Sequence, residues 1–317
     1  MCTAICFRSR DRYFGRNLDL ERGYGEQVVI SPRKFLFQHG SFRMSYNHYA
    51  MIGMATVAEG FPLYYEATNE MGLSMAGLNF PGNAFYGQPV PGKENIPPYA
   101  FVPWVLGQCE DLGTVEMLLS RIQLVREDFG SLLPLSPLHW MISDKQRSIV
   151  VESTVEGMKI WDNPFEVLTN NPPFDYHRTR LNDFMGLHVG PAGSQFAEKY
   201  DLRNYSLGMG ALGLPGDFSS SSRFVKAFFV KENSRCREEE VSSVHQFFHI
   251  LGSVSMPRGC VWTENGYEYT RYSSCCNVDR GIYYYTTYYD RQIKSVHLFD
   301  ANLDGHTLQA YRVVGLE

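Results

Sequence analysis

The second residue of the chain, Cys2, could perform nucleophilic chemistry without help from a distant side chain. Removal of Met1 would leave Cys2 with a thiol and a free α-amino group. An α-amino group has an ordinary pKa of about 7.7–8.0 and a cysteine thiol one of about 8.5, so near neutral pH the amine can accept the thiol's proton. These groups predict an N-terminal nucleophile that attacks a carbonyl carbon. The alternative is a structural cysteine in a buried first strand.

Two charged residues in the segment GRNLD could assist this thiol. Residues 3–7 and 12–18 read as strands around the polar RSRD, which predicts a β-hairpin with Cys2 at its open end. The second strand would return Arg16 and Asp19 towards Cys2. We expect Asp19 to hold the α-amino group and Arg16 to favour the thiolate. An ion pair at the surface is the alternative for these two residues.

Composition narrows the classes of partner. The 317 residues include 29 Lys and Arg against 34 Asp and Glu, a net charge of −5 without a basic run, which argues against nucleic acid and anionic membranes. We find no secretory signal and no apolar run long enough to span a bilayer, and therefore expect a cytoplasmic protein without membrane contact. Seven cysteines without a CxxC motif argue against a disulfide framework.

Blocks of strands alternate with pairs of helices, and no long linker divides them. The pattern predicts an α+β fold, with two antiparallel sheets packed face to face, helices outside them, and one domain over residues 1–317. Residues 184–215 are rich in glycine, and we expect an excursion from the core there. Strands are predicted at 49–56, 63–68, 72–80, 138–144, 148–154, 157–163, 165–171, 268–278, 281–289 and 293–300, and helices at 98–109, 112–123, 221–233 and 240–254.

Two histidines have the spacing of zinc ligands on a helix. His245 and His249 lie four residues apart in HQFFH, but the glutamate of the zinc-protease motif is missing between them. We interpret both as ordinary helix residues and predict no metal ligand in this chain.

Several motifs together resemble the choloylglycine hydrolase family, which contains bile salt hydrolases and penicillin V acylases. In order, they are MCTAI, FGRNLD, NEMGLSMAGLNFPG, LHWMISD, VLTNNPPFDYH, LGLPGDFSSSSRF, YSSCCNV and GIYYYTTY. The resemblance implies an N-terminal-nucleophile hydrolase with an αββα sandwich. It also implies that Cys2 is the nucleophile, that Arg16 and Asp19 lie beside it, and that no metal or organic cofactor takes part.

The resemblance assigns three more catalytic positions. It implies that the backbone N–H of Asn79 and the side-chain amide of Asn170 form the oxyanion hole, and that Arg223 supplies positive charge near the thiol. Taken without the family, both asparagines would be turn residues and Arg223 would be a solvated residue of an amphipathic helix.

The two substrate classes of the family differ in the acyl half of the amide that is cleaved. The family tends to have Asn at the position of Asn79 in bile salt hydrolases and Tyr there in penicillin V acylases. We therefore expect glycine- or taurine-conjugated bile salts as small-molecule substrates, with penicillin V as the alternative. By resemblance, the loops around the acyl site offer a set of apolar residues, namely Leu20, Tyr24, Phe61, Leu133 and Leu135.

From the resemblance to the family we also expect a homotetramer, in which residues 184–215 contribute to the subunit contact. Two other hypotheses stay open at this point. One is a non-catalytic ligand-binding member that retains Met1, and the other is a papain-like enzyme, which would need a histidine beside the thiol.

Overall fold

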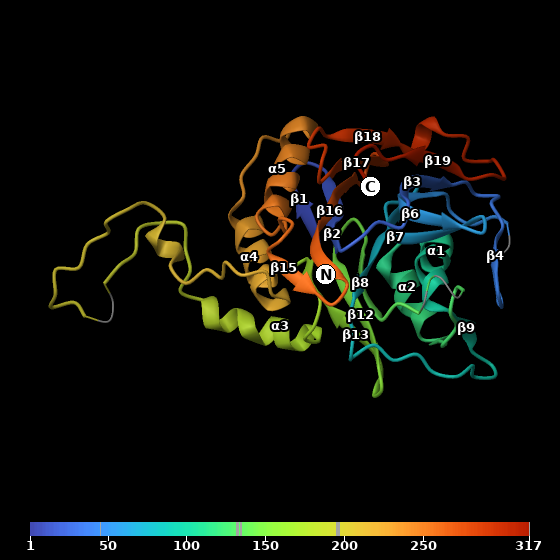
Figure 1. Cartoon of the computed structure of the whole chain (residues 1–317), viewed down its shortest axis with the longest axis horizontal. Helices are drawn as coiled ribbons and strands as arrows, with labels where there is room; N and C mark the ends of the chain where they lie inside the picture. The colour runs from blue at the N-terminus through green and yellow to red at the C-terminus, as the bar shows by residue number, and fades with distance from the viewer. Residues whose placement is uncertain (45, 131–132, 134, 195–196, 317) are drawn as a thin grey trace.

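Two antiparallel sheets lie face to face with helices on their outer sides, as predicted (Figure 1). The structure is a computed structural model that describes residues 1–44, 46–130, 133, 135–194 and 197–316. In the first sheet the strand order is β14-β1-β2-β16-β17-β18, with β15 paired to β16. Its strands are β1 (Cys2–Arg8), β2 (Arg12–Leu20), β14 (Val167–Leu168), β15 (Val261–Thr263), β16 (Gly266–Asn277), β17 (Ile282–Thr287) and β18 (Lys294–His297).

The second sheet has the order β13-β12-β11-β8-β7-β6-β3-β19. Its strands are β3 (Glu26–Ser31), β6 (Met51–Ala58), β7 (Phe61–Asn69), β8 (Ser74–Asn79), β11 (Leu138–Ser143), β12 (Ser148–Thr154), β13 (Gly157–Asp162) and β19 (Gln309–Arg312). Four short strands pair outside the two sheets: β4 (Phe37–His39) with β5 (Phe42–Met44), and β9 (Glu94–Ile96) with β10 (Ile122–Leu124).

Helices cover both outer faces. The pair α1 (Pro98–Gln108) and α2 (Leu112–Leu119) lies against the second sheet, and the pair α4 (Ser220–Asn233) and α5 (Glu240–Gly252) lies against the first (Figure 1). The helix α3 (Phe174–Arg180) lies beside α4, and short 3-10 turns occur at Leu181–Phe184, Met209–Ala211 and Leu298–Asp300.

The layered order explains why the first two strands are so apolar. The first sheet is enclosed by the α4–α5 pair on one side and the second sheet on the other, so Cys2–Phe7 of β1 are buried on both faces of the strand. A second apolar cluster fills the space between the second sheet and α1, where Phe101 packs edge-on against Trp140 with ring centroids 4.8 Å apart. Burial on both faces replaces the alternating pattern of a half-exposed strand.

The hairpin that carries Cys2 forms as predicted. β1 pairs with β2 in antiparallel register, with Cys2 opposite Leu18 and Arg8 opposite Arg12. Cys2 therefore lies at the open end, and the turn lies at the other.

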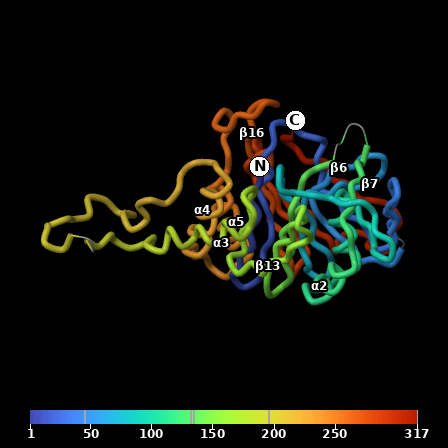
Figure 2. Tube along the Cα trace, turned by 90° about the horizontal axis from the view of Figure 1, so that it is seen from below, coloured from blue at the N-terminus to red at the C-terminus, as the bar shows by residue number. Residues whose placement is uncertain are grey.

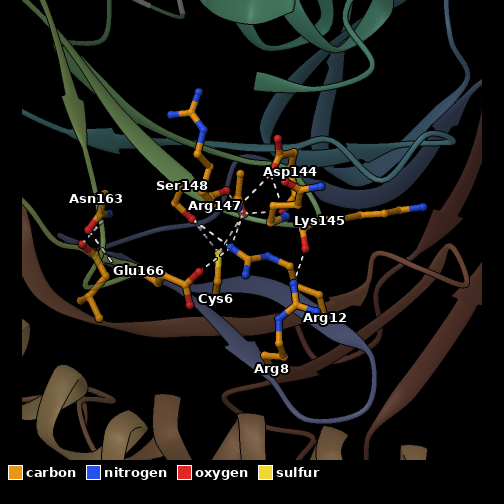
Figure 3. A network of polar contacts seen from close by, with 12 residues as sticks. Cys6, Arg8, Arg12, Asp144, Lys145, Arg147, Ser148, Asn163 and Glu166 are labelled. Atoms are coloured by element: carbon orange, nitrogen blue, oxygen red, sulfur yellow. Dashed lines mark hydrogen bonds and ion pairs between the residues drawn. The ribbon is translucent and has the colours of Figure 1, made fainter. Parts of the chain in front are cut away.

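At the turn end, a buried arginine joins the two sheets (Figure 3). Arg12 donates from Nη2 to Ser143 Oγ (3.0 Å) and Ser148 Oγ (3.2 Å) of the second sheet, and to Glu166 Oε1 (2.5 Å) before β14. The thiol of Cys6 donates to Ser143 Oγ (3.2 Å), and burial raises the pKa of this thiol, so Cys6 stays protonated in the core. These contacts fix the hairpin against β11 and β12.

The strand predicted at 165–171 is confirmed only at Val167–Leu168, which form β14, and is wrong on both sides of them. The side chain of Asn170 donates to a backbone carbonyl, Asn171 is followed by two prolines, and α3 begins at Phe174. Prolines lack the N–H that a strand ladder needs, and asparagine side chains compete for the backbone. The strands β3, β4, β5, β9, β10, β15 and β19 and the helix α3 were not expected from the sequence. The helix predicted at 112–123 ends at Leu119, and its last two predicted residues belong to β10.

Residues 184–194 and 197–215 project far from the body as a long excursion, which both views show (Figures 1 and 2). In its described part, large apolar side chains are exposed to solvent, namely Met185, Val189, Tyr200, Leu202, Tyr205, Leu207 and Leu212. In the described residues no helix has both the length and the apolar character needed to cross a membrane.

Candidate active site

Cys2 lies at the wall of a cavity of about 280 Å³. The residue is 3% exposed, because β1 is covered on both sides at this point. The cavity wall is mostly apolar and is formed by β2, β7, the first turns of α1 and the segment that precedes β11. Its lining residues are Cys2, Arg16, Leu18, Leu20, Tyr24, Thr56, Leu63, Tyr64, Tyr65, Gly77, Asn79, Pro98, Tyr99, Val102, Glu127, Phe129, Leu133, Leu135, Ser136 and Leu138.

The nitrogen atoms at the start of the chain are held by hydrogen bonds. The α-amino nitrogen of Met1 donates to the backbone carbonyl of Asp19 (2.8 Å) and forms an ion pair with Glu268, and burial lowers the pKa of this amine. The backbone nitrogen of Cys2, which would become the amine after loss of Met1, donates to Asn170 Oδ1 (2.8 Å).

Asp19 lies beside Cys2 but holds different groups from those we expected. Its side chain accepts a hydrogen bond from Thr270 Oγ1 (2.6 Å) through Oδ1, and its backbone rather than its carboxylate contacts Met1. The second carboxylate oxygen, Oδ2, is buried without a hydrogen-bond partner among the described residues. An unpartnered buried carboxylate oxygen is costly, so Oδ2 is available to accept a bond from an amine.

Asn170 joins the two sheets at the nucleophile. Its Nδ2 donates to the backbone carbonyl of Asn79 (2.7 Å), and its Oδ1 accepts from Arg223 Nη2 (2.7 Å) as well as from Cys2. The side chain is 4% exposed, and a second proton on Nδ2 is available for another acceptor.

The backbone N–H of Asn79 points to an open edge of β8. The backbone N–H of Phe80 donates to the carbonyl of Pro137 (2.7 Å). In an antiparallel ladder, this bond makes the preceding pair, Asn79 and Leu138, one that exchanges no hydrogen bonds between β8 and β11. The N–H and C=O of Asn79 therefore face the other edge of β8, where pairing with β7 ends at Ala76. Asn79 and Cys2 both line the cavity at this edge.

Arg16 reaches this edge from the opposite sheet. Its Nη1 donates to Gly77 O (2.6 Å) and Tyr65 O (3.1 Å), and its Nη2 is buried with no bonded acceptor in the described structure. Burial opposes the charge, but Cys2 and the acidic groups around the guanidinium outweigh it and raise the pKa of Arg16. Arg16 therefore carries a permanent positive charge beside the thiol.

Arg223 is also buried, at 1% exposure, on the first turns of α4. It donates to the carbonyl of Cys2, to Thr3 Oγ1 (2.7 Å) and to Asn170 Oδ1 (2.7 Å). Burial lowers the pKa of Arg223, and the charges of Asp19 and Cys2 oppose this effect. The alternative of a solvated helix residue is wrong, because α4 lies against β1 at this turn.

Four of the five residues predicted for the acyl site line the cavity: Leu20, Tyr24, Leu133 and Leu135. Phe61 does not. It is buried in the outer apolar cluster between Phe37, Phe42 and Phe129, and so it lies behind the cavity wall. Large aromatic residues near a pocket are often core, and the sequence offers no means of distinguishing the two.

Several residues at the site were not found by sequence reasoning. β7 contains a bulge at Tyr65, because Met54 pairs with Glu66 whereas Ala55 pairs with Tyr64. The bulge frees the carbonyl of Tyr65 for Arg16, in keeping with the frequent occurrence of bulges beside active sites. Its sequence, LYYEA, carries no glycine or other bulge signal.

A buried carboxylate lies behind Arg16. Glu66 Oε2 is 3.9 Å from Arg16 Nε, and the carboxylate accepts from the hydroxyls of Tyr272 (2.8 Å) and Tyr283 (2.5 Å). Burial raises the pKa of Glu66, and Arg16 and the tyrosines oppose that rise. The sequence offered one indication of Glu66, namely a glutamate within an otherwise apolar strand.

The arrangement suits acyl transfer at an amide carbonyl. Cys2, Arg16 and Asn79 line an apolar cavity, and the side chains of Asn170 and Arg223 contact the backbone of Cys2. No histidine occurs among the described residues that line the cavity, so a papain-like thiol–histidine pair lacks its base there. In the part of the chain that the structure describes, no group of three or more His, Cys, Asp or Glu side chains is placed to hold a metal ion.

Comparison with known proteins gives consistent matches over the whole chain. The model of the linear amide C–N hydrolases, choloylglycine hydrolase family, matches residues 2–311. A bile salt hydrolase/transferase of Lactiplantibacillus plantarum is 51% identical over 312 residues, which cover 98% of this chain and 96% of the relative. A bile salt hydrolase/transferase of Clostridium perfringens is 36% identical over 98% of this chain and 97% of its own length.

Solved structures agree with the fold. A crystal structure of a variant of conjugated bile acid hydrolase from Clostridium perfringens superposes with a TM-score of 0.92 at 34% identity, covering 99% of this chain and 98% of that one. Penicillin V acylase from Agrobacterium tumefaciens gives a TM-score of 0.75 at 18% identity, covering 98% and 90% of the two chains. The second likeness concerns the fold alone.

Proposed function

The chain belongs to the choloylglycine hydrolase family of linear amide C–N hydrolases, and on this premise we propose that it hydrolyses the amide bond of bile salts conjugated with glycine or taurine. The relatives that carry this activity in their names match the chain from end to end. The apolar cavity beside Cys2 suits a steroid acyl group, because apolar surface provides most of the binding free energy for such a ligand.

Cys2 is the nucleophile in the proposed mechanism, after removal of Met1. The free α-amine takes the thiol proton, and the sulfur attacks the amide carbon to form a tetrahedral adduct. The negative oxygen of the adduct accepts bonds from the N–H of Asn79 and from Nδ2 of Asn170. The ammonium group then protonates the leaving glycine or taurine nitrogen, the C–N bond breaks, and a thioester remains.

Water completes the reaction. The amine takes a proton from the water, hydroxide adds to the thioester, and the C–S bond breaks to release the bile acid and Cys2. Arg16 and Arg223 hold positive charge near the sulfur and the adduct through both steps, and Asp19 Oδ2 accepts a bond from the ammonium group.

One observation carries the proposal: the side chain of Asn170 contacts both the nitrogen of Cys2 and the carbonyl of Asn79, and these two residues line the apolar cavity. A non-catalytic binding protein has no evident need for this convergence with two buried arginines.

The test is parallel hydrolysis of glycocholate, taurocholate and penicillin V by protein whose mass demonstrates loss of Met1, with Cys2→Ala as the control. Release of glycine or taurine that is faster than penicillin V cleavage and is abolished in the variant supports the proposal. Faster cleavage of penicillin V places the enzyme with the acylases, and cleavage of none of the three rejects the substrate class.

We also propose that residues 1–317 act as one domain and that the protein is a homotetramer. The projecting excursion, with its exposed apolar side chains, supports a subunit contact at residues 184–215. A cytoplasmic location remains our proposal from the sequence.

A further inference from the structure

The segment that carries Asn170 belongs to no strand or helix. β14 ends at Leu168 and α3 begins at Phe174, so the ladder of a sheet does not hold residues 169–173. A side chain in a productive oxyanion geometry must nevertheless be fixed within a fraction of an ångström. Its backbone therefore needs other partners.

Two buried histidines contact consecutive carbonyl groups in this segment. His139 Nε2 lies 2.9 Å from Thr169 O, and His177 Nε2 lies 2.9 Å from Asn170 O. Neither ring is more than 1% exposed. The backbone N–H of Asn170 donates to Ser220 Oγ (2.8 Å), so both polar groups of this residue's backbone are bonded.

Neighbouring groups fix the direction of each ring. His139 stacks on Phe80, with centroids 4.2 Å apart and an interplanar angle of 5°, and its Nδ1 faces Glu152 Oε1 at 3.2 Å. His177 stacks on Phe224, with centroids 4.8 Å apart and an angle of 12°. The ring of His139 is therefore held by the residue that follows β8 and by β12, and the ring of His177 is held by α4.

The protonation of His177 suits a donor. Burial lowers its pKa to about 4, so the ring is neutral near pH 7 and carries one N–H. Nδ1 has no hydrogen-bond partner among the described residues, whereas Nε2 faces a carbonyl oxygen. The proton therefore resides on Nε2, and the ring donates to Asn170.

We propose that His177, supported by His139 at the preceding carbonyl, is a positioning residue that aims the side-chain amide of Asn170 at the reacting carbonyl. This inference rests on the proposed function, because it assigns the purpose of a contact within that site. His177 does not act as a base, since its ring contacts the backbone of Asn170 and does not line the cavity.

The test compares His177→Phe, which keeps the stacked ring but removes the donor, with His177→Gln, which keeps a donor at a similar reach. His245→Phe, at an exposed position of α5, is the matched control. For each protein we would measure kcat and KM on whichever of glycocholate, taurocholate and penicillin V the wild type cleaves fastest. The rate at which iodoacetamide alkylates Cys2 would be followed by peptide mass.

We expect kcat to fall about ten- to a hundredfold in His177→Phe while KM and the alkylation rate of Cys2 stay unchanged, because only the aim of the oxyanion donor is lost. His177→Gln should keep kcat within about threefold of the wild type, and His245→Phe should change nothing. Wild-type kcat in His177→Phe would overturn the inference. So would a loss in His177→Gln as large as in His177→Phe, because the ring rather than its donor would then matter.

Ser220→Ala provides an independent test if His177→Phe fails to fold. It removes the acceptor of the Asn170 N–H and should also lower kcat without changing KM, and an unchanged kcat would overturn the inference. If the proposed function is wrong, the wild-type enzyme will cleave penicillin V faster than bile salts. The kcat of each variant can then be compared with that of the wild type on penicillin V, so the two failures are distinguishable.

Discussion

The side-chain amide of Asn170 donates to the backbone carbonyl of Asn79 over 2.7 Å, and this contact ties the loop before α3 to the open edge of β8. The two residues are 91 positions apart in the chain. The same amide accepts a hydrogen bond from the nitrogen of Cys2, so a side-chain donor lies close to Cys2 and to Asn79, which lines the cavity, as stabilisation of an oxyanion requires.

Replacement of Asn170 tests this arrangement. Asn170→Ala should lower kcat by about 10²–10³, because one oxyanion donor is lost. Asn171→Ala is the control, since Asn171 contacts Pro81 O at the surface and should retain most of the activity. Steady-state kinetics on glycocholate would decide, and equal losses in the two variants would contradict the assignment.

Cys2 should be the cysteine on which activity depends. Cys2→Ala should abolish hydrolysis, whereas Cys6→Ala should retain it, because Cys6 is buried at the turn end of the hairpin and bonded to Ser143. Product release measured by chromatography would show the difference. Loss of activity in Cys6→Ala at unchanged folded content would argue against Cys2 as the sole nucleophile.

The stability of the protein should depend on His177 at mildly acidic pH. Its pKa is about 4 in the folded protein against an ordinary value of 6.5, so between these values the unfolded chain binds more protons than the folded one. The free energy of unfolding should therefore fall by about 3 kcal/mol from this group as the pH drops from 6.5 to 4. In His177→Gln, the free energy of unfolding should fall less over this pH range, by that amount, as measured by urea unfolding. If the free energies of the two proteins change with pH in parallel, the prediction is wrong.

The cavity wall and the core behind it should respond differently to truncation. Leu20→Ala should raise KM for glycocholate severalfold, because Leu20 lines the cavity. Phe61→Ala should mainly lower the free energy of unfolding, by about 3–5 kcal/mol, because Phe61 is buried among aromatic side chains. Measurements of KM and of the free energy of unfolding by urea on both variants would separate the two effects. A change of KM alone in Phe61→Ala would show that Phe61 contacts the substrate.

The excursion should carry the subunit contact. Charges introduced at Tyr205→Glu and Leu207→Lys, on exposed apolar positions, should reduce the mass in solution below that of a tetramer, because apolar surface drives most subunit association. Val155→Lys, an exposed apolar residue outside the excursion, is the control. Light scattering after size-exclusion chromatography would measure the masses, and a wild-type monomer would refute the tetramer itself.

The sequence predicted the elements whose signals are local. The helix pairs follow from apolar residues at steps of three and four, and the hairpin of Cys2 follows from two apolar strands around a polar turn. The resemblance to known enzymes supplied Asn79, Asn170 and Arg223, which no local pattern distinguishes from ordinary turn and helix residues.

Tertiary structure alone decided how these residues meet. Phe61 and Leu20 were both expected at the acyl site, and only the packing of α1 against the second sheet places Phe61 in the core, whereas Leu20 lines the cavity. The carbonyl of Tyr65, at the bulge of β7, accepts a hydrogen bond from Arg16 of the facing sheet, a contact between residues 49 positions apart. Contacts at such separation depend on the whole fold, so the sequence determined which groups are present and the packing of the two sheets determined which of them converge on Cys2.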